Sequence, residues 1–356
     1  MRDLVDISFL FDKRYKEIGI IDVRSENEFL EDHIPNAINI PILNNEERAI
    51  VGTIYKQKGH KDARLKGVSI VAPKLEDFIM KVKDVTDRFG DTLIYCWRGG
   101  LRSEASVTFS RLAGLTVSRL SGGYKSYRSE VNRFMEEDVG KFNFITVYGP
   151  TGSAKTKILS FINSDQYPFL DIEKYACHKG SSFGHIEEAG YPFVTQKNFE
   201  SNIYYDLICR QKKLILTEGE SKKVGKVVIP KNIFKKMTSG FGVLVKPSIE
   251  FRIKFTIENY NPQNNIAEIK NSLNKIKRYL DGNLYNEMLD LLDRGEFEKF
   301  TEIILVKYYD PLYKHSYIEK VNREISFDSI DEGIKKIKEI YDEVYYSFHN
   351  NVNLCS

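Results

Sequence analysis

The amino-acid sequence predicts an α/β protein with two parallel-sheet units in succession and a helical region after them. In the first unit, short apolar strands such as Ile18–Ser25 and Thr92–Cys96 alternate with amphipathic helices. That alternation is typical of parallel sheets whose two faces are covered by helices. A second strand–helix alternation begins with "FNFITVY" (142–148), and after about Pro247 the sequence becomes charged and helical in its periodicity.

These changes in pattern divide the chain into three predicted regions. The first covers residues 1–138 and ends near the acidic stretch "MEEDVGKFN". The second covers 139–246, and the helical third region, 247–356, is expected to pack on the second. A length of 356 residues suits two or three domains.

Composition excludes several classes of protein. With 42% hydrophobic residues the chain can bury a sizeable core, and no apolar run approaches the length of a membrane span. Charges throughout the first residues interrupt any signal-peptide core, so we expect a cytoplasmic protein with no membrane partner. The four cysteines form no close pair, which argues against zinc fingers and a disulfide framework. A net charge of +3 allows a nucleic-acid partner only through a local basic patch.

The elements of the first unit follow one another clearly. The strand Ile18–Ser25 ends in charged residues, and the stretch Lys74–Gly90 places apolar residues at helical spacing before a terminal glycine. The strand Thr92–Cys96 comes next, and helical periodicity resumes at Ser103 and stops at Gly114. The sequence therefore predicts that Cys96 lies at the carboxyl edge of a parallel sheet, where α/β proteins bind ligands.

The loop after this strand, "CWRGGLR", combines a thiol with groups that attract anions. Successive backbone N–H groups in such a loop converge on one point at a helix N-terminus, and Gly99 and Gly100 permit the positive φ that the curl requires. Arg98 and Arg102 add permanent positive charge. Such surroundings lower the pKa of a thiol, which indicates that Cys96 is a nucleophile.

Two chemistries fit this Cys-x5-Arg loop. In a phosphatase or arsenate reductase, Cys96 would attack the central atom and Arg102 would hold its oxygens. In a sulfur-group carrier, Cys96 would bear a persulfide or its selenium equivalent. The stretch "DVRSENEFLEDHIPNAINIP" (Asp22–Pro41) resembles the signature of a rhodanese-like domain, which favours the carrier.

A glycine-rich loop, "GPTGSAKT", opens the second unit between a strand and a helix. This is the context of a P-loop, in which backbone N–H groups surround phosphate oxygens. Lys155 would supply a charge and the Thr156 hydroxyl could bind Mg²⁺. The loop has Ala154 where such loops usually have glycine. The predicted phosphate-binding residues are Gly149, Thr151, Gly152, Ser153, Ala154, Lys155 and Thr156.

Acidic residues near two predicted strand ends are candidates for a Mg²⁺ or acid–base role. Asp171 and Glu218 are the foremost of these, in "FLDIE" and "LILTEGES", and Glu173 and Glu220 lie beside them. An acidic group at a strand end is the usual second element of a P-loop site, although solvated strand ends also carry such residues.

The pairing of the two loops in one chain resembles the tRNA 2-selenouridine synthase family. The similarity extends over nearly the whole chain and includes "ERAIVGTIYKQKG", "YCWRGGLRS", "GGYKSYR", "DIEKYACHKGSSFG", "TEGESKKVGKVVIP" and "YYDPLY". The resemblance implies a transferase that acts on tRNA. It replaces the sulfur of a wobble 2-thiouridine with selenium by way of S-geranyl-2-thiouridine, using geranyl diphosphate and selenophosphate as co-substrates.

The resemblance also implies a role for each loop. Cys96 would take selenium from selenophosphate, while Arg98, Arg102 and the loop amides hold the donor's oxygens. The P-loop would bind the diphosphate of the geranyl donor, with Mg²⁺, and we expect Tyr191–Val194 and Phe199 to wall an apolar slot beside it. We infer tRNA and these small molecules as partners and no other protein.

Two other functions remain open from the residues alone. One is a Cys-x5-Arg phosphatase or arsenate reductase with a nucleotide-binding domain, and the other is a persulfide relay whose P-loop senses nucleotide. Candidate tRNA contacts are the basic clusters Arg210–Lys213, Ser221–Lys226 and Lys275–Tyr279, each of which also reads as a solvated helix face. The other cysteines, Cys177, Cys209 and Cys355, lack the setting of Cys96, so we expect them to be dispensable for the chemistry.

Overall fold

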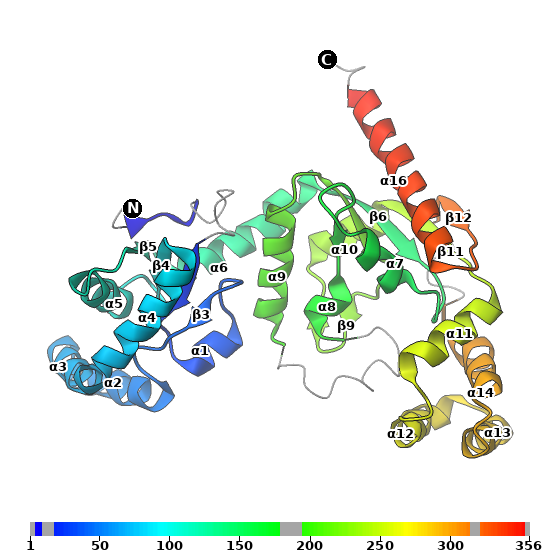
Figure 1. Ribbon diagram of the computed structural model, residues 1–356, viewed down its shortest axis with the longest axis horizontal. Coiled ribbons are helices and arrows are strands. Elements are labelled where there is room, and N and C mark those ends of the chain that lie inside the picture. Colours follow the sequence, from blue (N-terminus) through cyan, green and yellow to red (C-terminus); the bar gives the residue numbers. More distant parts are fainter. Residues whose placement is uncertain (1–3, 9–17, 179–193, 314–320, 353–356) are drawn as a thin grey trace. The chain divides into compact units, whose positions relative to one another are not determined.

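The computed structural model describes residues 4–8, 18–178, 194–313 and 321–352. The chain forms two compact units. The first unit comprises 1–137 with 193–209, and the second comprises 138–192 with 210–356. Figure 1 shows both units coloured along the sequence. No helix in the described ranges is long and apolar enough to cross a membrane.

The first unit is built on a parallel sheet of five strands in the order β1-β5-β4-β2-β3. The interior strands β4 and β2 have all their residues buried, as the apolar Leu93–Tyr95 and Ile20–Ile21 predict. The strands are β1 (Leu4–Val5), β2 (Gly19–Asp22), β3 (Ile38–Asn39), β4 (Thr92–Tyr95) and β5 (Val117–Leu120).

The helices of the first unit cover this sheet. The apolar face of α4 (Leu75–Phe89) packs into the core through Phe78, Val82 and Val85, and the helix ends at Gly90 with φ 72°, as predicted. The other helices are α1 (Glu26–Glu31), α2 (Asn45–Lys58), α3 (His60–Val71), α5 (Leu101–Leu112), α6 (Gly123–Arg133) and α9 (Gln196–Ile208), and a π-helical turn (Phe134–Asp138) follows α6.

Helix α9 differs from its predicted assignment, because the sequence analysis placed its residues within the second region, 139–246. It groups with the first unit instead. Ser201 donates a hydrogen bond to the buried Asp32, and the ring of Tyr204 packs edge-on against those of Tyr127 and Phe134. These partners are remote in sequence, so no local pattern could indicate them.

The second unit is also built on a parallel five-stranded sheet, in the order β12-β11-β6-β8-β7. Helices α7 and α16 pack against its core. The strands are β6 (Asn143–Tyr148), β7 (Phe169–Leu170), β8 (Leu214–Glu218), β11 (Phe241–Val245) and β12 (Arg323–Ile325), with a separate antiparallel pair, β9 (Lys223–Val224) and β10 (Val227–Val228). The helices around the sheet are α7 (Lys155–Ile162), α8 (Ile172–Ala176), α10 (Lys231–Ser239) and α16 (Ile330–Val352).

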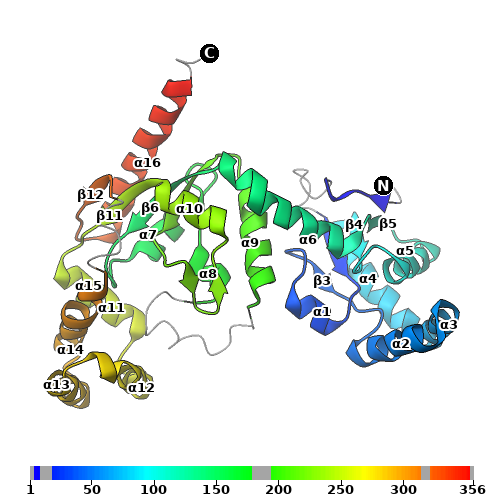
Figure 2. The same ribbon diagram turned by 180° about the vertical axis from the view of Figure 1, so that it is seen from behind.

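The predicted helical region after Pro247 has two parts in the structure. The first is a lobe with its own core around Leu273, Met288 and Leu305, which both views show below the sheet (Figures 1 and 2). The lobe contains α11 (Ile249–Tyr260), α12 (Ile266–Ile276), α13 (Gly282–Asp293), α14 (Phe297–Ile303), a π-helical turn (Ile304–Tyr309) and α15 (Asp310–Tyr313).

The second part of that region returns to the sheet. Strand β12 pairs with β11, and α16 adds Ile337 and Tyr341 to the same core as Leu159 of α7. The three residues of β12 carry two charged side chains, so they offer no strand signal of their own. Residues 247–356 are therefore part of the second α/β unit as well as a helical lobe beside it.

Candidate functional site

Cys96 follows β4 directly and begins the loop that leads into α5. Its side chain is almost fully buried, with 3% exposure, and its Sγ lies 3.2 Å from the Ser103 hydroxyl. The same hydroxyl lies 3.1 Å from the Gly100 carbonyl oxygen. Ser103 can therefore donate a hydrogen bond to a Cys96 thiolate by turning away from that carbonyl, which gives the loop a polar group that the sequence reasoning missed.

The loop curls through one left-handed residue instead of two. Gly99 has φ 65°, whereas Gly100 has φ −94° and caps α5, so only one of the two glycines adopts the positive φ that both permit. A second glycine turn, Gly122–Gly123, packs against this loop. Backbone N–H groups of Tyr124 and Lys125 donate to the carbonyls of Cys96 and Trp97. A Cβ at Gly123 would lie only 2.2 Å from the Cys96 carbonyl oxygen, which explains the glycines of "GGYKSYR".

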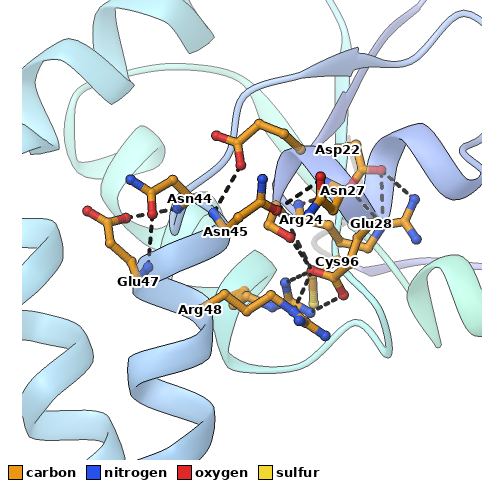
Figure 3. A network of polar contacts seen from close by, with 12 residues as sticks. Asp22, Arg24, Asn27, Glu28, Asn44, Asn45, Glu47, Arg48 and Cys96 are labelled. Atoms are coloured by element: carbon orange, nitrogen blue, oxygen red, sulfur yellow. Dashed lines mark hydrogen bonds and ion pairs between the residues drawn. The ribbon is translucent and has the colours of Figure 1, made fainter. Parts of the chain in front are cut away.

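The two arginines of the loop differ in their surroundings. Arg98 is exposed and forms no ion pair with any described residue. Arg102 pairs through both terminal nitrogens with Glu28, at 2.6 and 3.2 Å, and Arg48 of α2 contacts the same carboxylate at 2.9 Å. Figure 3 shows Glu28 and Arg48 beside Cys96. Although burial acts to raise it, the hydrogen bonds from Arg102 hold the pKa of Glu28 below its usual value.

The "DVR" motif forms the buried support beneath this loop. Arg24 donates to both carboxylate oxygens of Asp22, at 2.6 to 3.0 Å, and to the Asp32 carbonyl at 2.6 Å. The ring of Tyr124 covers its guanidinium at 4.0 Å. Because Asp22 and Arg24 are both almost completely buried, they act as a structural pair and hold the strand ends in register with the loop.

The glycine loop in the second unit joins β6 to α7. A Cβ at Gly149 would lie 2.5 Å from the Val245 side chain, and Gly152 has φ 79°. Ala154 adopts a left-handed conformation with φ 57° and ψ 20°, in the position where glycine is usual. Lys155 folds over the loop, with its Nζ 3.0 Å from the Gly149 carbonyl oxygen and 3.3 Å from the Ser153 hydroxyl. Its ammonium is therefore at the place where phosphate oxygens would be held.

A buried arginine from the helical lobe supports this loop. Arg252 of α11 donates its Nε–H to the Thr151 carbonyl at 3.0 Å and pairs with Asp310 at 2.6 and 3.0 Å. Asp310 belongs to the "YYDPLY" stretch, which the sequence analysis quoted without a role. The arrangement ties the lobe to the backbone of the phosphate loop.

Three carboxylates gather next to Lys155 and Thr156. Oxygens of Glu173, Glu218 and Glu220 all lie within 4.8 Å of one another, and Glu173 Oε2 is 3.3 Å from the Thr156 hydroxyl. Burial, together with repulsion from Glu173, raises the pKa of Glu218 well above its usual value and that of Glu220 to about 7. Glu218 Oε1 is buried and has no hydrogen-bond partner among the described residues, so it is an acceptor that a cation could satisfy.

Other candidates from the sequence lie elsewhere. Asp171 caps the N-terminus of α8 by accepting a hydrogen bond from the Lys174 N–H at 2.9 Å, and it is outside the group of three glutamates. Phe199 is completely buried in α9 with the first unit, so its predicted place in a slot beside the P-loop has no support. Residues 191–193 and Cys355 lie outside the described residues. Cys177 ends α8 with φ 47°, and Cys209 follows α9.

Several cations of the predicted basic clusters already contact neighbouring groups of the protein. Lys212 lies 4.2 Å from the ring centre of Tyr345 and hydrogen-bonds to the Gln166 carbonyl, and Lys213 lies 4.4 Å from that of Phe142. Arg278 stacks on Tyr279 and donates a hydrogen bond to its hydroxyl. These cations are less available to an RNA than their sequence suggests.

Comparison with known proteins matches both units. Residues 10–130 fit the family model of the rhodanese-like domain, and residues 142–343 fit that of the tRNA 2-selenouridine synthase AAA domain. A tRNA 2-selenouridine synthase of Nitrosomonas europaea is 30% identical over 86% of this chain and 90% of its own length. That of Hydrogenovibrio crunogenus is 29% identical over 90% of this chain and 94% of its own length.

A solved structure is similar to part of the chain. The N-terminal domain of a putative ATP/GTP binding protein from Clostridium difficile 630 is 40% identical over 36% of this chain and 98% of its own, with a TM-score of 0.34. The second family model alone covers more than half of the 356 residues, and the curated relatives extend the match over both units. The chain belongs to the tRNA 2-selenouridine synthase family.

Proposed function

We propose that this protein converts 2-thiouridine in tRNA to 2-selenouridine in two steps, S-geranylation from geranyl diphosphate and then selenium transfer from selenophosphate. The observation that carries the proposal is the setting of Cys96, a buried thiol at a sheet edge that lies 3.2 Å from the Ser103 hydroxyl, in a loop whose Arg98 forms no ion pair with any described residue. The family membership supports selenouridine formation in tRNA, and the two loops supply one site for each co-substrate.

In the selenium step, Cys96 is the nucleophile that frees selenium from its donor. Its thiolate attacks the phosphorus of selenophosphate, the P–Se bond breaks and selenide leaves, while Arg98 and the loop amides hold the phosphoryl oxygens. The selenide displaces the geranyl thiol from C2 of the uridine, and water then releases phosphate from the S-phosphocysteine. Arg102 is held by Glu28, so an incoming oxyanion must share it with this carboxylate or displace it. This arrangement disfavours a Cys-x5-Arg phosphatase, in which the arginine must be open to the substrate.

In the geranylation step, the glycine loop binds the diphosphate. Lys155 and the loop amides neutralise the charge that grows on the leaving diphosphate as the thiouridine sulfur takes the geranyl carbon. S-alkylation also explains the order of steps, because an alkylated sulfur leaves the pyrimidine as a thiol, whereas a thiocarbonyl sulfur is a poor leaving group.

The residues beside the glycine loop fit Mg²⁺. Glu173, Glu218 and Glu220 together with the Thr156 hydroxyl offer oxygen ligands, the kind that Mg²⁺ prefers, and Glu218 Oε1 is an unsatisfied buried acceptor among them. When bound, the ion would offset the negative charge of the diphosphate. Asp171 caps α8 and lies outside this group of ligands, so we assign it no role in binding Mg²⁺.

The test is nucleoside mass spectrometry after incubation of 2-thiouridine tRNA with the protein. With geranyl diphosphate alone, S-geranyl-2-thiouridine should appear, and subsequent selenophosphate should convert it to 2-selenouridine. Failure to form either nucleoside, with release of phosphate from a generic aryl phosphate, would reject the proposal in favour of the phosphatase.

A further inference from the structure

The helix pair α2–α3 of the first unit has no partner in the described structure that explains its surface. Helix α2 buries none of its residues, and α3 buries only Ala63. Several large apolar side chains stay in solvent instead, including Tyr55 at 49%, Leu65 at 63% and Val68 at 64% exposure. Exposed apolar side chains of this size on a helix pair mark a surface that binds a partner.

This pair also carries a concentrated positive charge. Between Arg48 and Val71 there are six basic residues and one acidic residue, a net charge of +5, in a chain whose total is +3. The remainder of the protein is therefore slightly negative. Five of these cations are exposed and form no hydrogen bond or ion pair with another described residue: Lys56, Lys58, Lys61, Arg64 and Lys66.

Both ends of the pair are fixed at the rim of the cysteine loop. Glu47 near the start of α2 forms an ion pair with Lys74, three residues after α3. The Asn45 N–H donates to Glu26 at 3.0 Å, and Arg48 reaches Glu28, the partner of Arg102 (Figure 3). Because the 14 residues of α2 extend about 20 Å, the turn at Gly59 lies well away from this base.

Two glycines within the helices of the pair, Gly52 and Gly67, are not explained by contacts inside the protein. At Gly52 and Gly67 an added Cβ would meet nothing within 4 Å, so neither position is required by packing within the protein. Glycine in a helix interior costs about 1 kcal/mol relative to alanine. Because glycine has no side chain, Gly52 and Gly67 would let the backbone of a partner approach the helices closely, beside the exposed basic residues.

We propose that the α2–α3 pair is an RNA-docking arm, which binds the phosphates of the substrate's anticodon stem-loop and delivers its loop to Cys96. This rests on the proposed function, since it takes tRNA as the substrate. Exposed unpaired cations near the turn meet the phosphates. Tyr55, which packs edge-on against His60 at 4.5 Å, offers an aromatic face on which an unstacked base can lie.

The arm is tested by RNA binding with the full chain, separately from the chemistry. Fluorescence anisotropy with a labelled RNA hairpin containing 2-thiouridine in its loop is measured over a series of KCl concentrations. The variant K58Q/K61Q/R64Q should lose at least about tenfold in affinity, and the slope of log affinity against log salt should fall by about 2 to 3. The matched control K275Q/K277Q/R278Q removes the same charge from the lobe and should change affinity less than about threefold.

The aromatic contact has its own pair of variants. Tyr55→Ala should weaken binding by about 5- to 150-fold without changing the salt slope, while Tyr55→Phe, which keeps the ring, should bind as the wild type does. A loss of equal size in Tyr55→Phe would show that the hydroxyl and its contact with His60 matter, and would overturn the stacking role.

The outcomes separate this proposal from the proposed function. If the arm variant binds RNA as tightly as the wild type, or the control loses as much, the arm is not the docking site. Arm-dependent binding to vesicles containing phosphatidylserine, without arm-dependent binding to RNA, would also overturn it. Cleavage of selenophosphate by Cys96, followed as phosphate release, needs no RNA and should be normal in the arm variant. Its failure in the wild type would instead reject the proposed function.

Discussion

The three glutamates beside the glycine loop make a prediction about magnesium and pH. Two carboxylates at 4.8 Å repel each other by about 3.5 kcal/mol at an effective dielectric constant of about 20, and three such pairs exist here. Lys155 offsets only part of this repulsion. The apo protein relieves the rest by holding protons, which is why burial and Glu173 raise the pKa of Glu220 to about 7.

The sign of the pH dependence follows from these protons. The folded second unit keeps protons on Glu218 and Glu220 that the unfolded chain releases above its ordinary pKa of 4.5. Without metal, the unit should therefore lose stability as the pH rises from about 4.5 through about 7. Mg²⁺ must displace the same protons, so its affinity should increase over that range and level off near pH 8.

The assay is thermal unfolding of the full chain with and without Mg²⁺ at pH 6 and pH 8. At a Mg²⁺ concentration of about 100 times Kd, binding adds about 2.7 kcal/mol to stability. For a unit of about 200 residues this raises Tm by about 5 to 10 °C, and the increase should be larger at pH 8 than at pH 6. Glu218→Gln should melt higher than the wild type at pH 8 without metal and should lose the response to Mg²⁺.

A matched control is Asp171→Asn, which alters a carboxylate near the glutamates that caps α8 and lies outside their group. It should keep the response to Mg²⁺. An unchanged Tm of the wild type with Mg²⁺ at pH 8, or an equal Mg²⁺ response in Glu218→Gln, would refute the reasoning.

Three further predictions concern single residues. Gly123→Ala should destabilise the first unit by at least about 2 kcal/mol, because its Cβ meets the Cys96 carbonyl oxygen, whereas Gly100→Ala, which meets nothing, should stay within about 0.5 kcal/mol in urea unfolding. In separate half-reaction assays, Lys155→Ala should slow geranylation by roughly ten- to a hundredfold and leave selenation of pre-geranylated tRNA intact. The wild type should geranylate without ATP. Arg252→Ala should cost about 1 to 3 kcal/mol in urea unfolding, because it frees the Thr151 carbonyl and leaves Asp310 unpaired, while Asp310→Asn should cost less.

The parts of the fold that could be predicted from sequence are those with local causes. The strand before Cys96, the helix that ends at Gly90 and the strand–loop–helix around Lys155 follow from apolar runs, helical spacing and glycine positions within a few residues. The position of Cys96 follows from the same short stretch. It comes directly after the last residue of a parallel strand, and that position lies at the carboxyl edge of the sheet.

The parts that could not be predicted depend on contacts remote in sequence. Glu28 meets Arg102 across 74 residues, and Arg252 meets Asp310 across 58. Asp171 and Glu173 are only two residues apart, but Asp171 caps α8 whereas Glu173 contacts the Thr156 hydroxyl, a difference that the sequence does not indicate. Gly100 shows the limit of the glycine argument, because a glycine in a turn need not have positive φ.

The central claim is that Cys96 is required for the selenium step and takes no part in alkylation, and separate half-reactions with Cys96→Ser test it most directly. Nucleoside mass spectrometry of 2-thiouridine tRNA should show normal S-geranyl-2-thiouridine from geranyl diphosphate. On addition of selenophosphate, the variant should form no 2-selenouridine, whereas the wild type and a variant with serine at Cys177, Cys209 and Cys355 should. Full conversion to 2-selenouridine by Cys96→Ser would contradict the account.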